Sequence, residues 1–161
     1  MSLNEDKIKI PSKAETLIIG IGNPLRCDDG VGSYIADCIE SKGLKGVKVW
    51  VVHQLNVEDL ERMLEYNRII LVDAAIDGPL LDFRPVGKSE KSALASSHHL
   101  SVETLISLAQ SIYHKDLHIH LCSIKGSSFE VGDKISPDVL ERAQEAVELI
   151  CCSLMNLGVR N

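Results

Sequence analysis

Apolar residues follow two patterns along this chain, and each pattern predicts one kind of element. Short apolar runs rich in β-branched residues, bounded by glycine, proline or polar residues, are typical of strands. Apolar residues three and four positions apart are typical of helices with one buried face. The runs predict five strands, at Thr16–Ile21, Val47–Val52, Arg68–Ala74, Leu80–Val86 and Leu117–Ile124. The periodic segments predict four helices, which begin near Val31, Val57, Val102 and Val139.

The order of these elements predicts a three-layer α/β/α sandwich. Helices separate the first three strands, so these strands should run parallel, with the helices as crossovers. The third and fourth strands are joined through Asp77-Gly78-Pro79, which leaves no room for a helix. The fourth strand should therefore be antiparallel and lie near a sheet edge. We expect a polar tail at 1–14 and one α/β domain at 15–161, with a mostly parallel five-stranded sheet and one antiparallel strand.

Charge and composition narrow the class of partner. The formal net charge is −6, which predicts binding neither to nucleic acid nor to a membrane surface. No apolar run reaches the ~18 to 20 residues that span a bilayer, and the first 15 residues are too charged for a signal-peptide core. A cytoplasmic location is expected. The five cysteines include an adjacent pair and no C-x-x-C spacing, which favours reduced thiols over disulfides or a thiolate zinc site.

A glycine-rich loop joins the first strand to the first helix, where open α/β sheets commonly bind ligands. It runs from Gly20 to Gly32 with the sequence GIGNPLRCDDGVG. A dinucleotide-binding fingerprint would require glycine in place of Leu25, and the carboxylates of Asp28 and Asp29 would repel a phosphate. Two carboxylates instead attract a metal ion. The plainer interpretation is that both acids only stabilise the N-terminus of the first helix.

Asp73 and His98 add two metal-binding side chains. Asp73 ends the third strand, and parallel strands place their carboxyl ends at one edge of the sheet, beside the loop that carries Asp29. His98 ends an irregular segment just before the third helix. Two carboxylates and one imidazole suit an open site for nickel or zinc. Taken alone, Asp73 could instead cap a turn.

Three motifs together resemble the nickel-iron hydrogenase maturation endopeptidases, and they occur in the order seen in that family. The motifs are the G-x-G-N-x-L-x-x-D-D-G-x-G run, Val72-Asp73-Ala74, and the S-x-H-x-L segment from Ser96 to Leu100. The similarity spans about Leu17 to Leu157.

The resemblance implies a role for each matching residue. Asp29, Asp73 and His98 would be both the metal ligands and the catalytic residues, and Asp28 would be adjacent support. The metal would be nickel, presented by the precursor of a nickel-iron hydrogenase large subunit, and zinc or cadmium could replace it in a crystal. The precursor is the expected partner.

Two segments resemble one branch of the family, associated with cytoplasmic cofactor-reducing hydrogenases. These are His53-Gln54-Leu55, in which Asn56-Val57 then replaces the branch's Thr-Pro, and the stretch from Phe129 to Ser136. We expect the cleft to bind an extended tail of the precursor, with Gly22, Asn23 and His53 as the substrate-binding residues.

Other metal-capable side chains have plainer interpretations. His114, His118 and His120 have no third ligand in sequence and are expected to be structural or solvent-facing. His99 could replace His98 as the ligand. Cys27 could be a fourth ligand, although a loop thiol is more often incidental.

The sequence contains no motif of a conventional hydrolase, such as His-Glu-x-x-His or a nucleophile elbow. The resemblance therefore implies a peptidase that relies on nickel already held by its substrate and removes the precursor's C-terminal peptide after nickel insertion. A non-catalytic nickel-binding chaperone would use the same three ligands. A Rossmann-type nucleotide-binding module would share the strand, glycine loop and helix, but Leu25 and the two acids count against it.

Overall fold

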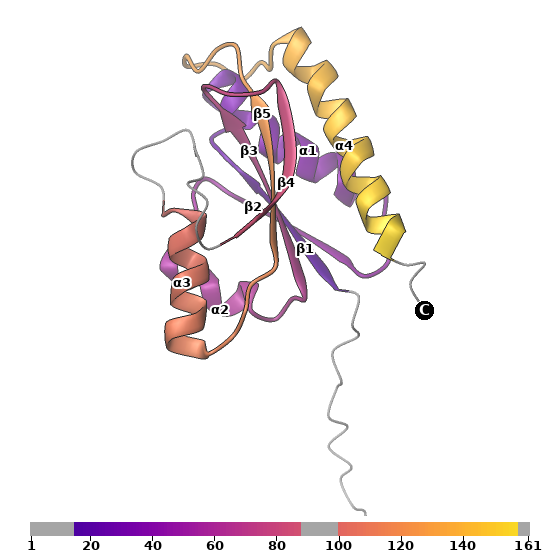
Figure 1. Cartoon of the computed structure of the whole chain (residues 1–161). Coiled ribbons are helices and arrows are strands. Elements are labelled where there is room, and N and C mark those ends of the chain that lie inside the picture. The colour runs from indigo at the N-terminus through magenta and orange to yellow at the C-terminus, as the bar shows by residue number, and fades with distance from the viewer. Residues whose placement is uncertain (1–14, 88–99, 158–161) are drawn as a thin grey trace, which may run out of the picture.

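The computed structural model describes residues 15–87 and 100–157, which fold into a sheet covered by helices on both faces (Figure 1). The strands are β1 (Thr16–Ile21), β2 (Val47–Val52), β3 (Arg68–Ala75), β4 (Leu81–Val86) and β5 (Ile119–Lys125). The helices are α1 (Val31–Glu40), α2 (Leu60–Met63), α3 (Val102–Tyr113) and α4 (Pro137–Leu157), with 3-10 turns η1 (Cys27–Gly30) and η2 (Val57–Asp59). The predicted tail at 1–14, His98 and His99 lie outside the described residues.

The strand order is β2-β1-β3-β5-β4. Strands β1, β2, β3 and β5 are parallel, and β4 is antiparallel at the edge, so the predicted sheet and its antiparallel edge strand are confirmed. The partner of β4 is β5, which lies between β4 and β3 although β4 directly follows β3 in sequence. The helix predicted near Val57 is only η2 followed by the single turn of α2.

The sheet separates two apolar layers. On one face, Leu17 and Leu71 of the sheet pack with Leu105 of α3. On the other face, Ile18 and Ile70 pack with residues of α1 and α4. Strand β3 is buried from Ile69 to Ala75, which explains its continuous hydrophobicity. None of the helices in the described parts of the chain is long and apolar enough to cross a membrane.

The start of α1 lies very close to the ends of β1 and β3. A Cβ atom on Gly32 would be 2.5 Å from the backbone oxygens of both Ile21 and Val72, so only glycine permits this approach. Gly22 has φ +136°, and a Cβ there would collide with the backbone oxygen of Asp29. The glycines of the loop are therefore required by packing, and this packing places Asp29 over the end of the sheet.

Candidate active site

The carboxyl edge of the parallel sheet gathers five of the predicted site residues. Asp29 comes from η1 and Asp73 from β3, and Gly22 and Asn23 follow β1 directly. His53 follows β2 and is exposed, and it lies near Gly22 because the backbone N–H of Gly22 donates to the carbonyl of Val52 at 3.0 Å. The sixth predicted residue, His98, lies outside the described residues.

The loop itself fixes the carboxylate of Asp29. The backbone N–H of Asn23 donates to Oδ2 of Asp29 at 2.8 Å, and the Oδ1 atom of Asn23 accepts from the N–H of Leu25 at 2.9 Å. No side-chain capping hydrogen bond forms at the N-terminus of η1 or α1, both of which lie within the described residues. The two acids therefore do not act as capping side chains, although both lie in the first turn of η1.

Asp73 is a buried carboxyl group next to a second negative charge. Its side chain is only 6% exposed. Burial and, to a smaller extent, the charge of Asp29 together raise the pKa of Asp73 to about 8, against the opposing effect of a hydrogen bond from the N–H of Ala74 at 2.8 Å. At neutral pH the folded protein therefore holds most of Asp73 in the protonated form.

The two carboxyl groups can supply oxygen ligands to a cation, but they are incomplete as a metal site by themselves. Among residues 15–87 and 100–157, no group of three or more His, Cys, Asp or Glu side chains is arranged to hold a metal ion. The cation would reduce the repulsion between Asp29 and Asp73 and replace the proton on Asp73.

Asp28 has a structural role that differs from that of Asp29. It is 0% exposed, and its carboxylate accepts four hydrogen bonds of 2.7–2.8 Å from the segment between β5 and α4. The donors are the backbone N–H groups of Ser127, Ser128 and Ser136 and the hydroxyl of Ser136. Burial alone would raise the pKa of Asp28, but these donors outweigh it and lower the pKa. Asp28 thus fastens the β5–α4 segment to the loop that carries Asp29.

We expect the Asp28→Asn variant to lose about 2 to 3 kcal/mol of unfolding free energy, because its amide group would face N–H donors in a buried site. Asp138→Asn is the matched control. Asp138 also accepts from this segment, through the Ser127 hydroxyl at 2.8 Å, but its side chain is 50% exposed and its loss should change stability little. Urea denaturation of both variants tests this, and equal stability of the two would contradict the fastening role of Asp28.

The remaining metal-capable residues have structural surroundings. His120 packs on Phe83, with ring centroids 5.6 Å apart, and burial lowers its pKa, with smaller contributions from Arg68 and His118. The backbone N–H of Cys27 donates to the carbonyl of Gly132 at 2.8 Å, and its sulfur lies against Gly132. Both side chains therefore pack against neighbouring parts of the fold.

Sequence reasoning missed the hydrogen bonds that Asp28 makes and the neighbour of Asp73 on β5. Ser123 pairs with Asp73 in register across the parallel strands, and residues paired in this way share one face of a sheet. In the sequence, an acidic residue such as Asp28 and serines about a hundred positions away give only a weak indication that they form hydrogen bonds. The serines of the β5–α4 segment could have suggested donors, but only the fold identifies their acceptor.

Several solved structures with the same fold are hydrogenase maturation proteases. They include the hydrogenase maturating endopeptidase HybD from E. coli (TM-score 0.74, 19% identity, covering 89% of this chain and 94% of that one). They also include the [NiFe] hydrogenase maturation protease HycI from Thermococcus kodakarensis KOD1 (TM-score 0.69, 22% identity, covering 88% of this chain and 93% of that one). A third is the hydrogenase 2 maturation peptidase from Thaumarchaeota archaeon SCGC_AB-539-E09 (TM-score 0.65, 23% identity, covering 87% of this chain and 97% of that one).

The chain therefore has the α/β fold of the hydrogenase maturation proteases over nearly its whole described length. No protein-family model matches the sequence, and no curated protein matches it either. At these identities the likeness is one of fold.

Proposed function

We propose that this protein is a nickel-dependent maturation endopeptidase, which removes the C-terminal peptide of a nickel-iron hydrogenase large-subunit precursor after nickel insertion. The observation that carries the proposal is the pairing of Asp29 with the buried Asp73 at the carboxyl edge of this fold. The pair is unfavourable without a cation and becomes favourable when a cation arrives. Such a pair is suited to sense whether the substrate has been loaded with metal.

Metal binding, proton transfer and substrate contact would fall to different residues of the chain. Asp29 is oriented by the N–H of Asn23, and Asp73 keeps its proton until a cation replaces it. His98 is proposed as the third ligand. Nickel held by the precursor would act as Lewis acid or water activator at the cleaved bond, and Asp29 or Asp73 would assist proton transfer. Gly22 and Asn23 would lie along the bound tail, and His53 would contact residues specific to this precursor.

The structure gives a physical reason against a nucleotide-binding role. A Rossmann-type loop binds phosphate with backbone N–H groups that follow the first strand. Here the N–H of Asn23, at that position, already donates to the carboxylate of Asp29. A phosphate would have to displace this hydrogen bond and approach two carboxyl groups, which is unfavourable.

Incubation of the purified protein with nickel-loaded precursor tests the proposal. We expect a shortened large subunit and a released C-terminal peptide, detected by mass spectrometry, and no cleavage of precursor that lacks metal. Binding of the nickel-loaded precursor without cleavage would instead identify a non-catalytic nickel-binding chaperone. Cleavage that is equally fast with and without nickel would contradict metal sensing.

A further inference from the structure

Large apolar side chains are exposed around the candidate active site. Nine are exposed among the described residues, and four of these belong to the loops at the carboxyl edge of the sheet. We call these four the apolar rim: Leu25, Ile76, Leu80 and Val131. Val131 is 93% exposed and Leu25 is 64% exposed. Exposed apolar groups that gather at one place commonly mark a binding surface.

The backbone holds the rim residues in two linked pairs. Leu25 and Val131 lie side by side because the N–H of Gly132 donates to the carbonyl of Leu25 at 2.9 Å, next to a bridge between Arg26 and Gly132. On the other side, the carbonyl of Leu80 accepts from the N–H of Lys125 at 3.0 Å. Ile76 follows Ala75, whose carbonyl accepts from the N–H of Gly126 at 2.9 Å.

One segment joins the two pairs. Lys125 and Gly126 bind the Leu80 and Ile76 side, and Gly132, six residues later, binds the Leu25 side. Between and beyond these points, the buried carboxylate of Asp28 holds the same segment by four hydrogen bonds. The rim is therefore attached to the sheet at several points and presents its apolar side chains in a fixed arrangement, which lowers the entropy lost on binding.

The rim is continuous with the catalytic carboxylates. Leu25 donates its N–H to Asn23, and Asn23 donates its own N–H to Asp29. Ile76 lies three residues after Asp73. A molecule that covers the rim would therefore lie over the two acids, so a second copy of this chain bound there would obstruct the site. The protein substrate, whose cleaved bond must reach these acids, is the occupant that the position favours.

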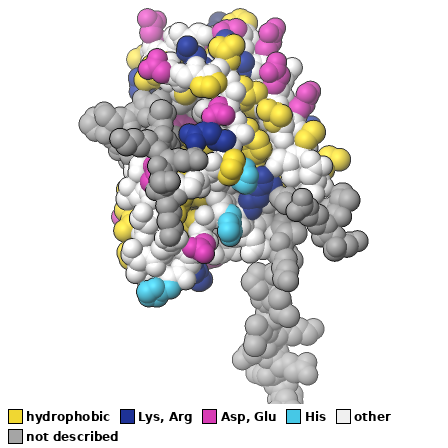
Figure 2. All heavy atoms as spheres, in the orientation of Figure 1, with side chains coloured by type: hydrophobic (Ala, Val, Ile, Leu, Met, Phe, Trp, Pro, Cys, Tyr) yellow, Lys and Arg dark blue, Asp and Glu magenta, His cyan; other side chains and the backbone are white. Residues whose placement is uncertain are grey.

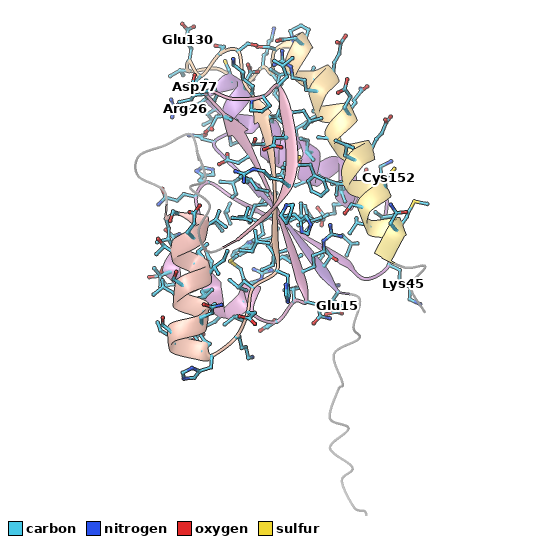
Figure 3. All side chains as sticks on the ribbon, viewed as in Figure 1. Glu15, Arg26, Lys45, Asp77, Glu130 and Cys152 are labelled. Atoms are coloured by element: carbon cyan, nitrogen blue, oxygen red, sulfur yellow. The ribbon has the colours of Figure 1, made fainter. Side chains whose placement is uncertain are left out.

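Charged side chains of both signs surround the rim. Arg26, Asp77 and Glu130 lie at this end of the molecule (Figure 3). In the view of Figure 2, hydrophobic side chains at the same end are interspersed with acidic and basic ones. Apolar anchors within a polar surround are typical of interfaces that form and separate repeatedly. An enzyme that must release its processed substrate needs such an interface.

We propose that the apolar rim is the docking surface for the protein substrate and binds apolar side chains of the segment that flanks the cleaved bond. This inference rests on the proposed function, because it takes the substrate to be the precursor. The carboxylates would sense the metal, and the rim would supply binding energy that does not depend on the metal. The two parts of recognition can then be separated by substitution.

The test compares Leu25→Ser, Val131→Ser and the double variant with Ile112→Ser, which removes a 59% exposed apolar side chain from α3. Binding of nickel-loaded precursor is measured by calorimetry, and cleavage is measured as KM and kcat. We expect each rim substitution to raise Kd and KM about tenfold, with kcat at saturation unchanged. Ile112→Ser should behave as the wild type. All four variants should have the melting temperature of the wild type, because the substituted side chains are exposed.

Three results would overturn the rim as the docking surface for the substrate. Unchanged Kd in the double variant overturns it, and so does a loss of binding that Ile112→Ser shares. A wild-type dimer that the rim substitutions dissociate, with precursor affinity unchanged, would make the rim a self-association surface and overturn it too. If the wild type binds the precursor through the rim but never cleaves it, the docking surface stands and the proposed peptidase activity fails.

Discussion

The Asp29→Asn and Asp73→Asn variants should process nickel-loaded precursor at least about a hundredfold more slowly than the wild type, while their melting temperatures do not fall. Each substitution removes a charged ligand for the cation, so activity is lost. Each also removes one partner of a repelling pair, because burial and, to a smaller extent, the charge of Asp29 raise the pKa of Asp73 to about 8. For Asp29→Asn this gain should offset the weakened hydrogen bond from Asn23.

Asp77→Asn is the matched control for this pair of variants. Asp77 follows β3 at the same end of the molecule, but it is exposed and lies four residues beyond Asp73 (Figure 3). Its substitution should leave cleavage at saturating precursor and the melting temperature unchanged. Cleavage rates by mass spectrometry and thermal melts of all three variants decide the matter. If Asp29→Asn retains activity, or if the loss of activity follows a lowered melting temperature, the carboxyl groups are structural.

The second large effect is on the pH dependence of stability. The pKa of Asp73 is about 8 in the folded protein and near the ordinary aspartate value of 3.8 in the unfolded chain. Between these values the folded protein holds a proton that the unfolded chain has released, so the free energy of unfolding falls as pH rises. The protonated Asp73 contributes fully to the free energy of unfolding below pH 4. As the pH rises above 4, this contribution falls by ~1.4 kcal/mol per pH unit, which amounts to about 4 kcal/mol by pH 7, and the fall ends near pH 8.

Asp73→Asn isolates this contribution, because every other titrating group is common to the two proteins. Urea denaturation at intervals from pH 4 to 8 should show the variant gaining stability relative to the wild type as the pH rises. The difference between the two curves should level off above pH 8. Parallel curves across this range would mean that Asp73 has an ordinary pKa in the folded protein and would contradict a cation-sensing pair.

Much of the fold follows from local patterns in the sequence. The continuous apolar run of β3 predicts a strand buried on both faces, and the strand is buried in this way from Ile69 to Ala75. The absence of room for a helix between β3 and β4 predicts an antiparallel strand near the edge, and β4 has that orientation and position. These features depend on side-chain periodicity and chain length, which neighbouring residues determine by themselves.

The sequence also placed the two carboxyl groups at one edge. The carboxyl ends of parallel strands meet there, so Asp73 and the loop after β1 had to be neighbours once the sheet was parallel. The third predicted ligand, His98, remains a prediction. Local patterns are weaker for short helices: the helix expected from Val57 to Leu64 is a 3-10 turn and one α-helical turn, because its apolar spacing alone does not fix its length.

Only the tertiary structure decided how the two adjacent acids differ. Asp28 is hydrogen-bonded to Ser136, 108 residues away, whereas the carboxylate of Asp29 is held by Asn23, six residues away. The raised pKa of Asp73 likewise depends on what buries it and on the charge of Asp29, neither of which its own strand contains. Element types follow from sterics and solvent exposure along the chain, but charges and hydrogen bonds depend on distances through space, which exist only after distant segments have packed together.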